Sequence, residues 1–152
     1  AVTTLGSVGT AARAAGVAED LRTTSPRLAY DDFQVASLRR QTGDVQARLE
    51  QRALELLPCL DILDRLLDGA VRPVASVGAK EGASIGVGRV ESPRGATTCI
   101  VERDGLRVGR VRLRTGSYAN WPAVAHAAAG NLLPDFPLIN KSFELCYACV
   151  DR

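Results

Sequence analysis

The stretch TTCIVERDGLRVGRVRLRT, residues 97–115, sets the β part of the fold. Asp104-Gly105 separates two β-prone segments, and such a dipeptide between apolar runs is the strongest short-range signal of a β-hairpin. Beyond this turn, Val111 and Leu113 alternate with arginines. Because successive side chains of a strand point to opposite faces, one face of the hairpin is predicted to be apolar and the other basic.

The residues before the hairpin are dense in glycine. Neither GAKEGAS at 78–84 nor GVGRVE at 86–91 completes a phosphate-binding fingerprint, so nucleotide binding is disfavoured. What glycine does allow is close approach of the backbone to a bulky neighbour. The Pro93-Arg94 pair follows at once, and the proline is expected to fix the arginine guanidinium in a set direction.

Apolar residues at three-and-four spacing predict one long amphipathic helix further upstream. These residues are Val45, Leu49, Ala53, Leu56, Leu60, Leu63 and Leu67. Pro58 removes a backbone hydrogen bond in the middle of this run, which predicts a kink or two abutting helices. Gly69 is expected to end the helix.

Shorter elements are expected on either side. The alanine-rich residues 7–22 predict a short helix, a break at Gly16 and another turn. After the hairpin, Asn120 is expected to cap a short helix, and residues 132–141, with their two prolines, are expected to be irregular. Together these signals predict an α+β fold, mainly helical with a small antiparallel β-hairpin or sheet, in a single domain over residues 1–152.

Composition bounds the class of protein. With 46% hydrophobic and 24% charged residues the chain is predicted to be soluble and globular, without the run of roughly 18 apolar residues that a bilayer span needs. A net charge of +2 with interspersed signs argues against nucleic acid as a partner. Methionine is absent, so Ala1 is not an untreated translational start, and the chain is expected to be part of a longer polypeptide. One histidine and no G-x-S-x-G segment disfavour hydrolase chemistry.

Four cysteines stand at positions 59, 99, 146 and 149. They do not form the framework of a small secreted disulfide protein, which favours a reducing, cytosolic compartment. Cys59 and Cys99 lie among apolar neighbours and are expected to be buried. Cys146 and Cys149 form a Cys-x-x-Cys pair, whose spacing lets two thiolates reach one metal ion. From the residues alone, a closed four-cysteine zinc site, a redox dithiol and no chemical role also remain open.

Four segments together resemble the catalytic large subunit of nickel-iron hydrogenases. The likeness is strongest to the membrane-associated, energy-converting branch, such as formate hydrogenlyase, and extends to the related 49-kilodalton subunit of respiratory complex I. The segments are GVAEDLR at 16–22, TGDVQARLEQRALELL at 42–57, GVGRVESPRG at 86–95 and NLLPDFPLINKSFELCYACVDR at 131–152. The resemblance covers nearly the whole chain and implies that it is the C-terminal portion of a larger catalytic subunit.

The resemblance also implies roles for individual residues. Cys146 corresponds to a terminal nickel thiolate, and Cys149 to a thiolate that bridges nickel and iron. Arg94 corresponds to an arginine above the diatomic ligands of the iron, in a pocket that Pro93 helps to shape. Arg94 and Cys146 are therefore the implied catalytic residues. The family's second Cys-x-x-Cys pair is not in this sequence, so an N-terminal half of the same subunit is expected to supply it.

The same resemblance implies an oxidoreductase that reversibly oxidises H₂ and is active only within a larger complex. Expected partners are an iron-sulfur small subunit with a 4Fe-4S cluster, and membrane-arm subunits that hold the protein peripherally on the cytoplasmic face of the membrane. The chain departs from the hydrogenase pattern at Glu144-Leu145, where Asp-Pro is usual, and at Ser92, where alanine is common.

Alternatives follow from how the motifs are distributed in the family. G-x-G-R-x-E-x-P-R-G is shared by both branches, whereas the terminal cysteine pair is typical of hydrogenases and is lost in complex I subunits. One alternative is a complex I-like NADH:quinone oxidoreductase subunit with a vestigial pair. The others are a metal-free interaction or assembly protein of the same fold and a zinc-bound structural domain.

Overall fold

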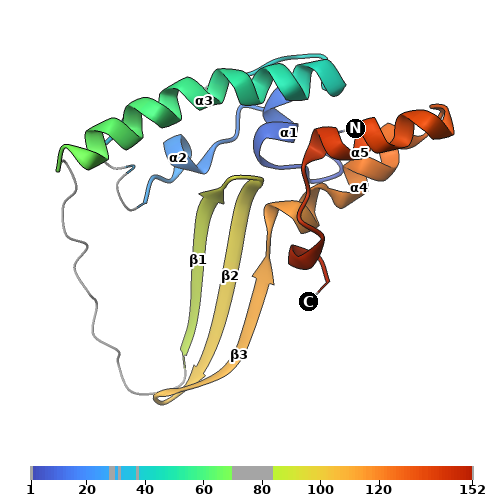
Figure 1. Ribbon diagram of the computed structural model, residues 1–152. Helices are drawn as coiled ribbons and strands as arrows, with labels where there is room; N and C mark the ends of the chain where they lie inside the picture. Colours follow the sequence, from blue (N-terminus) through green and yellow to red (C-terminus); the bar gives the residue numbers. More distant parts are fainter. Residues whose placement is uncertain (1, 28–29, 31, 37, 70–83, 152) are drawn as a thin grey trace.

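The computed structural model describes residues 2–27, 30, 32–36, 38–69 and 84–151. These residues form α-helices gathered at one end of a three-stranded antiparallel sheet (Figure 1), which confirms the predicted α+β class. The helices are α1 Gly9–Ala14, α2 Leu21–Thr24, α3 Val45–Leu67, α4 Gly116–Ala128 and α5 Phe136–Phe143. The strands are β1 Ser84–Ser92, β2 Gly95–Asp104 and β3 Arg107–Arg114. None of the described helices combines the length and apolar character of a membrane span.

β2 and β3 form the predicted hairpin, and β1 pairs with the other edge of β2. Asp104 pairs with Arg107, so the two turn residues are Gly105 and Leu106, one position further along than Asp104-Gly105 suggested. Gly105 has a φ of +58°, in the left-handed region that tight hairpin turns require and that glycine adopts without strain. The GAKEGAS segment, apart from Ser84, lies outside the described residues.

The predicted apolar face of the hairpin exists but is not buried. Val111 pairs with Val101, and Leu113 with Cys99, which places these side chains on one face of the sheet. Val111 is nevertheless 57% exposed and Leu113 42% exposed. The helices gather where β2 begins, so the rest of the sheet projects away from them (Figure 1).

The core is small and is built mainly by α1, α4 and α5. Its buried residues are Ala11, Ala123, Val124, Ile139 and Phe143. Leu5 and Leu145 pack against this cluster from opposite ends of the chain. Because Leu145 directly precedes Cys146, the cysteine pair is anchored next to the core.

α4 begins earlier than expected. Thr115 caps it, because its Oγ1 accepts a hydrogen bond from the Tyr118 amide at 3.2 Å. Asn120 therefore lies inside the helix and is buried, so the prediction that it is the N-cap was wrong. Its side-chain amide instead bonds to the backbone of Val8 and Arg94.

Residues 132–141 were expected to be irregular, and this prediction was also wrong. They contain a 3₁₀ turn over Leu133–Asp135 and most of α5. Both prolines of the segment occupy the first positions of these helices. At such positions the missing amide has no helical partner to lose, so proline starts a helix there instead of preventing one.

α3 is one continuous helix through Pro58 and not two abutting helices. Asp44 caps its first turn by accepting a hydrogen bond from the Ala47 amide at 2.7 Å. Gly69 follows its end with a φ of +83°, in agreement with the expected stop.

α3 turns most of its leucines outward. Its buried residues, Ala47, Arg48 and Gln51, are mostly polar, whereas several of its large apolar residues are exposed. We call five of them the leucine stripe: Leu49, Leu56, Leu60, Leu63 and Leu67, which are 66, 57, 47, 53 and 83% exposed. The inner face of α3 instead makes ion pairs and hydrogen bonds with α1, α2 and α5, so its orientation is set by charge and not by its leucines.

Candidate metal centre

The turn between β1 and β2 is held by close backbone packing. A Cβ atom added to Gly9 would lie 2.3 Å from the Gly95 Cα, and one added to Gly116 would lie 2.5 Å from the Arg94 carbonyl oxygen. Close approach of backbones therefore occurs at Gly95, whose φ is +118°. It was expected in the glycine-rich residues before Pro93-Arg94, and this expectation was wrong at Gly86 and Gly88, which have open space at the Cβ position.

Asn120 locks this turn from inside α4. Its Oδ1 accepts a hydrogen bond from the Val8 amide at 2.9 Å. Its Nδ2 donates to the Val8 carbonyl at 3.0 Å and to the Arg94 carbonyl at 3.1 Å. Sequence patterns missed this role, because a buried asparagine inside a helix has no local signature.

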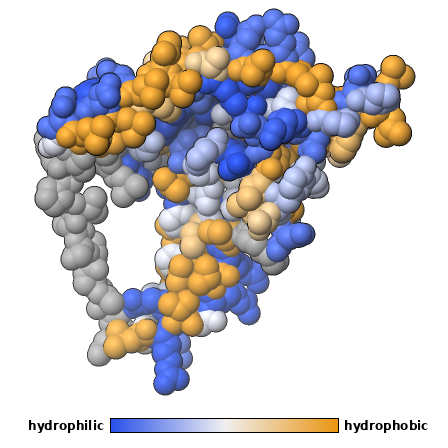
Figure 2. Space-filling model, in the orientation of Figure 1, coloured by the Kyte–Doolittle hydropathy of each residue, from blue (hydrophilic) through white to orange (hydrophobic). Residues whose placement is uncertain are grey.

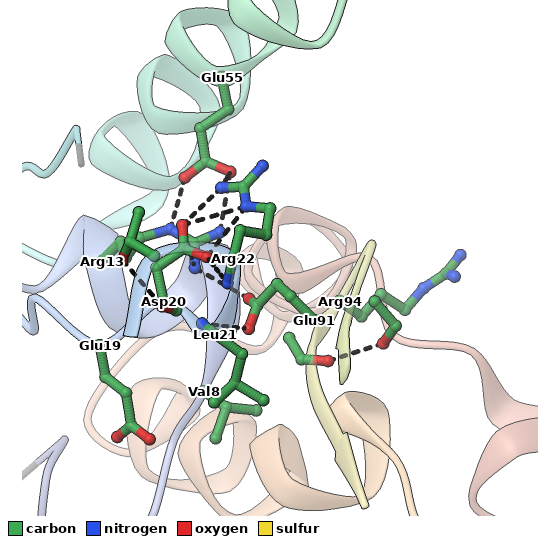
Figure 3. Close-up of polar contacts among 12 residues, drawn as sticks. Val8, Arg13, Glu19, Asp20, Leu21, Arg22, Glu55, Glu91 and Arg94 are labelled. Carbon is green, nitrogen blue, oxygen red and sulfur yellow. Dashed lines mark hydrogen bonds and ion pairs between the residues drawn. The ribbon is translucent and has the colours of Figure 1, made fainter. Parts of the chain in front are cut away.

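Arg94 links the turn to the C-terminal segment. Its Nε donates a hydrogen bond to the carbonyl oxygen of Glu144, fifty positions away. In Figure 3 its guanidinium points away from the carboxylates of Asp20, Glu55 and Glu91. The direction of the Arg94 side chain is thus set by a tertiary contact as well as by its place after Pro93.

The Cys-x-x-Cys pair flanks a short 3₁₀ turn, Tyr147–Cys149, beside the first turn of α4: Cys146 directly precedes this turn and Cys149 is its last residue. The Cys146 amide donates to Ser117 Oγ at 3.0 Å, and Thr115 Oγ1 donates to the Cys149 carbonyl at 3.1 Å. Both cysteines are half-buried. Hydrogen bonds from the side chain and the amide of Cys149 lower the pKa of Cys146, and the charge of Arg94 acts in the same direction.

These two sulfurs are the soft donors that nickel, iron and zinc prefer. Among the described residues, no group of three or more His, Cys, Asp or Glu side chains is arranged to hold a metal ion. Cys59 is exposed, which corrects the expectation that it is buried, and Cys99 is half-buried in β2. The closed four-cysteine zinc site is therefore not formed within the described part of the chain, and the pair fits half of a four-thiolate centre.

Three arginines hold the C-terminal end of α5, just before the pair. Arg48 Nε donates to Ser142 Oγ at 2.8 Å, Arg52 Nη1 donates to the Ser142 carbonyl at 2.6 Å, and Arg94 binds the Glu144 carbonyl. The last carbonyls of a helix lack helical partners and carry partial negative charge, so cations are favourable there. Burial lowers the pKa of Arg48 to about 10, which leaves it a cation at neutral pH.

The same contacts explain how the chain proceeds without the usual Asp-Pro. Glu144 ends α5 in the left-handed region, with a φ of +53°, and is the only described non-glycine residue with a positive φ. Its carbonyl is bound by Arg94, and Leu145 is seated against the core. The Arg94 contact and the packing of Leu145 thus restrain the segment just before Cys146. In the usual Asp-Pro sequence, the proline would restrain the backbone locally.

Next to the turn lies a buried ion network, drawn in Figure 3. Arg13 donates to both carboxylate oxygens of Glu55 at 2.6 and 2.8 Å and to Glu91 at 2.9 Å. Arg22 pairs with Asp20 at 2.6 Å. The network joins α1, α2, α3 and β1, so it fixes the strand that leads into the Pro93-Arg94 turn.

In this network, charge pairing has a larger effect on the pKa values than burial has. Burial alone would lower the pKa of Arg13, but hydrogen bonds to Glu55 and Glu91 and the nearby negative charges raise it. Burial alone would raise the pKa values of Asp20 and Glu55, but Arg22 and Arg13 respectively lower them. These three groups therefore remain charged at neutral pH.

A cavity of about 340 Å³ separates the network from the Glu144 segment. Arg52, Leu56 and Cys59 of α3 line one wall, and Pro93 and Glu144 line another. Pro93 thus lines a pocket beside the residues that carry Arg94 and the cysteine pair.

Comparison with known proteins identifies the family of this chain. A family described as "Respiratory-chain NADH dehydrogenase, 49 Kd subunit" matches residues 1–84 and 74–152. The chain is 33% identical over 152 residues to formate hydrogenlyase subunit 5 of Escherichia coli (strain K12), covering 96% of this chain and 26% of that protein. It is also 33% identical over 156 residues to an NADH-quinone oxidoreductase subunit of Salinispora arenicola (strain CNS-205), covering 97% of this chain and 40% of that protein.

A solved structure supports the same assignment. The fold matches a chain of the membrane-bound sulfane sulfur reductase, an archaeal respiratory membrane complex, with a TM-score of 0.78 and 28% identity over 97% of this chain and 43% of that one. This chain thus spans between about a quarter and two fifths of the length of the proteins that it matches. It belongs to the family of the 49-kilodalton subunit of respiratory-chain NADH dehydrogenase, whose members include hydrogenase-type subunits of energy-converting complexes.

Proposed function

We propose that this chain is the C-terminal part of the catalytic large subunit of an energy-converting nickel-iron hydrogenase. The observation that carries the proposal is the contact from Arg94 to Glu144, which brings the G-x-G-R-x-E-x-P-R-G turn next to the Cys146/Cys149 pair. A cation beside two thiols in one turn is a suitable arrangement for a thiolate metal site with an arginine in its surroundings.

Cys146 and Cys149 would supply two of the four thiolates that hold a nickel-iron centre with diatomic ligands on the iron. When bound, such a centre would supply the chemistry for heterolytic splitting of H₂. The sulfur of Cys146 would accept the proton. The described residues fit one half of this centre, and an N-terminal half of the subunit would bring the other two thiolates.

Arg94 would contribute a fixed positive charge and N–H donors. Its Nε is occupied by the Glu144 carbonyl, so its side chain is positioned before any ligand arrives. The terminal Nη groups would then face the metal ligands without a cost of reorganisation. Water would be excluded from the cavity beside Pro93 once the remaining part of the subunit is in place.

The partners would be an iron-sulfur small subunit and membrane-arm subunits. Through them the protein would lie on the cytoplasmic face of the membrane. Relatives named as a membrane-bound hydrogenase subunit and as NADH-quinone oxidoreductase subunits support such an assembly. Nucleic acid has no place in this proposal, because the net charge is only +2.

A second candidate is a subunit of an NADH:quinone oxidoreductase in which the cysteine pair has no metal. It is favoured by the relative from Salinispora arenicola, which is as similar to this chain as formate hydrogenlyase subunit 5 is. Under this alternative the two thiols serve only to pack the C-terminal turn against α4. A metal-free assembly protein of the same fold would give the same result.

Cysteine variants of the intact complex separate the candidates. We expect Cys149→Ser to abolish H₂ oxidation with an artificial electron acceptor, because the bridging thiolate is lost. Cys99→Ser is the matched control, since Cys99 lies in β2 away from the pair, and it should keep activity near that of the unsubstituted complex. Equal activity in both variants would reject the metal assignment, and quinone reduction without H₂ oxidation in all three complexes would favour the second candidate.

A further inference from the structure

The leucine stripe of α3 is an ordered row of apolar side chains that the described residues do not use for their own folding. Its residues recur at intervals of seven, four, three and four, which is the seam spacing of two packed helices. From Leu49 to Leu67 this seam runs for about 27 Å at 1.5 Å per residue. Figure 2 shows hydrophobic surface along α3, between the hydrophilic regions on either side.

The stripe is not explained by the fold of the described residues. α3 is held by its other face, where Arg48, Gln51 and Glu55 make hydrogen bonds to α1, α5 and the segment before α3. Every member of the stripe is more than 40% exposed. A row of exposed leucines at helical spacing is typical of a surface that another polypeptide covers.

The stripe continues into the cavity beside the candidate metal centre. Leu56 belongs to both, and Cys59 and Arg52 extend the same wall. Pro93 and Glu144 also line this cavity. A helix that covers the stripe at Leu56 therefore reaches the rim of the cavity.

We propose that the leucine stripe is the docking surface for a helix from the N-terminal half of the same large subunit, the half that also carries the second Cys-x-x-Cys pair. The choice of partner rests on the proposed function. Two thiolates of the proposed centre would come from a polypeptide that reaches the cavity lined by Leu56 and Glu144. In addition, this chain covers only 26 to 43% of the three proteins named above, so these proteins contain further chain able to supply such a helix.

The partner is accordingly a helix with its own row of large aliphatic side chains at three-and-four spacing. Each leucine of the stripe that this helix covers leaves water, and burial of apolar surface is the main favourable term in association. Five such residues in one row form a continuous seam along which two halves of a subunit can pack. The contact at Leu56 would also exclude water from one side of the cavity.

Site-specific photocrosslinking in the intact complex tests this inference. Benzoylphenylalanine replaces Leu60, in the middle of the stripe, and in a matched control it replaces Leu106 at the hairpin tip, which is 74% exposed. We expect position 60 to yield an adduct with a peptide from the N-terminal half of the large subunit and position 106 to yield none with that half. An adduct with a second copy of this chain, with another subunit or with none would overturn the inference.

The nickel content of the same preparations keeps this test separate from that of the function. If nickel is present but position 60 crosslinks to a different polypeptide, the docking surface is refuted and the proposed function stands. The expected adduct without nickel would refute the function and leave the docking surface intact. As a second variant, Leu60→Glu combined with Leu63→Glu is expected to lower the thermal midpoint of the large subunit in the purified complex, whereas Leu106→Glu leaves it unchanged. An unchanged midpoint in the double variant would also overturn the inference.

Discussion

Arg94 and Glu144 are joined by a hydrogen bond from the Arg94 Nε to the Glu144 carbonyl, although fifty positions separate them in sequence. Arg94 is held on one side by the packing of Gly95 and Gly116 and on the other by this bond. Glu144 ends α5 two residues before Cys146. The guanidinium and the cysteine pair are therefore parts of one connected assembly.

The guanidinium of Arg94 is not replaceable by an ammonium. Lysine keeps the charge but has no Nε donor in a planar fork, so Arg94→Lys loses the bond to Glu144 and the direction of the side chain. We expect a fall in H₂ oxidation on the order of a hundredfold in the intact complex, comparable to the loss of a preorganised donor in other active sites. Arg107→Lys, at the exposed end of β3, should retain activity. Full activity of Arg94→Lys would refute the role given to the guanidinium.

Asn120 is expected to matter for stability more than any other polar residue of α4. Asn120→Ala leaves the Val8 amide and the carbonyls of Val8 and Arg94 without their partner inside the protein. An unsatisfied buried polar group costs about 1 to 3 kcal/mol, so the free energy of unfolding should fall by at least this amount. Urea denaturation measures it. Asn131→Ala, whose amide bonds only to exposed carbonyls of its own turn, should change stability little.

The glycines around the turn differ sharply in their tolerance of a methyl group. In Gly116→Ala the new Cβ would lie 2.5 Å from the Arg94 carbonyl oxygen, so the turn must move. Overpacking of this kind typically costs about 1 to 3 kcal/mol, and the displacement should also lower activity. Gly88→Ala has open space and should be nearly neutral. Equal thermal stability of the two variants would contradict the packing described for the turn.

The ion network makes stability depend on acid pH. The pKa values of Asp20 and Glu55 are lower in the folded protein than their ordinary values of about 3.9 and 4.3 in an unfolded chain. Their contribution is therefore complete above about pH 5 and is lost as the pH falls through the folded pKa values. The urea midpoint should decline below about pH 4.5. Glu55→Gln should make this decline shallower, whereas Glu50→Gln, an exposed position on α3, should reproduce the original curve.

Local sequence signals predicted the helices and strands better than the tertiary contacts that these elements make. The hairpin follows from Asp104-Gly105 and the alternation beyond it, and α3 follows from its periodicity, because turns and helices are decided over a few neighbouring residues. The start of α4 was misplaced because Asn120, a favourable cap residue, is used in a distant contact with Val8 and Arg94. Tertiary contacts of this kind leave no trace in local spacing.

The orientation of α3 could not be predicted from its periodicity. Periodicity showed that the helix is amphipathic, but not that most of its leucines face outward. The buried side carries Arg48, Gln51 and Glu55, whose partners lie in segments far along the chain. For the same reason Cys59, expected to be buried, is exposed. A sequence pattern identifies an apolar face but not the polypeptide that covers it.

The sequence motifs identified the residues of the candidate site. The side chains that hold these residues in place could not be predicted from the sequence. Pro93, Arg94, Cys146 and Cys149 stand in two motifs, which the contact from Arg94 to Glu144 brings together. Arg48 and Arg52, which hold the end of α5, were not anticipated. Their spacing of four residues on one helix face was the available signal, but it is equally common on solvated helices.

The most direct measurement of the central claim is the metal content of the purified intact complex. Elemental analysis should give close to one nickel per large subunit in the unsubstituted complex and almost none in Cys146→Ser, with Cys99→Ser retaining the metal. Absence of nickel from the unsubstituted complex, or the same nickel content in Cys146→Ser as in Cys99→Ser, would contradict the assignment of Cys146 and Cys149 as metal ligands.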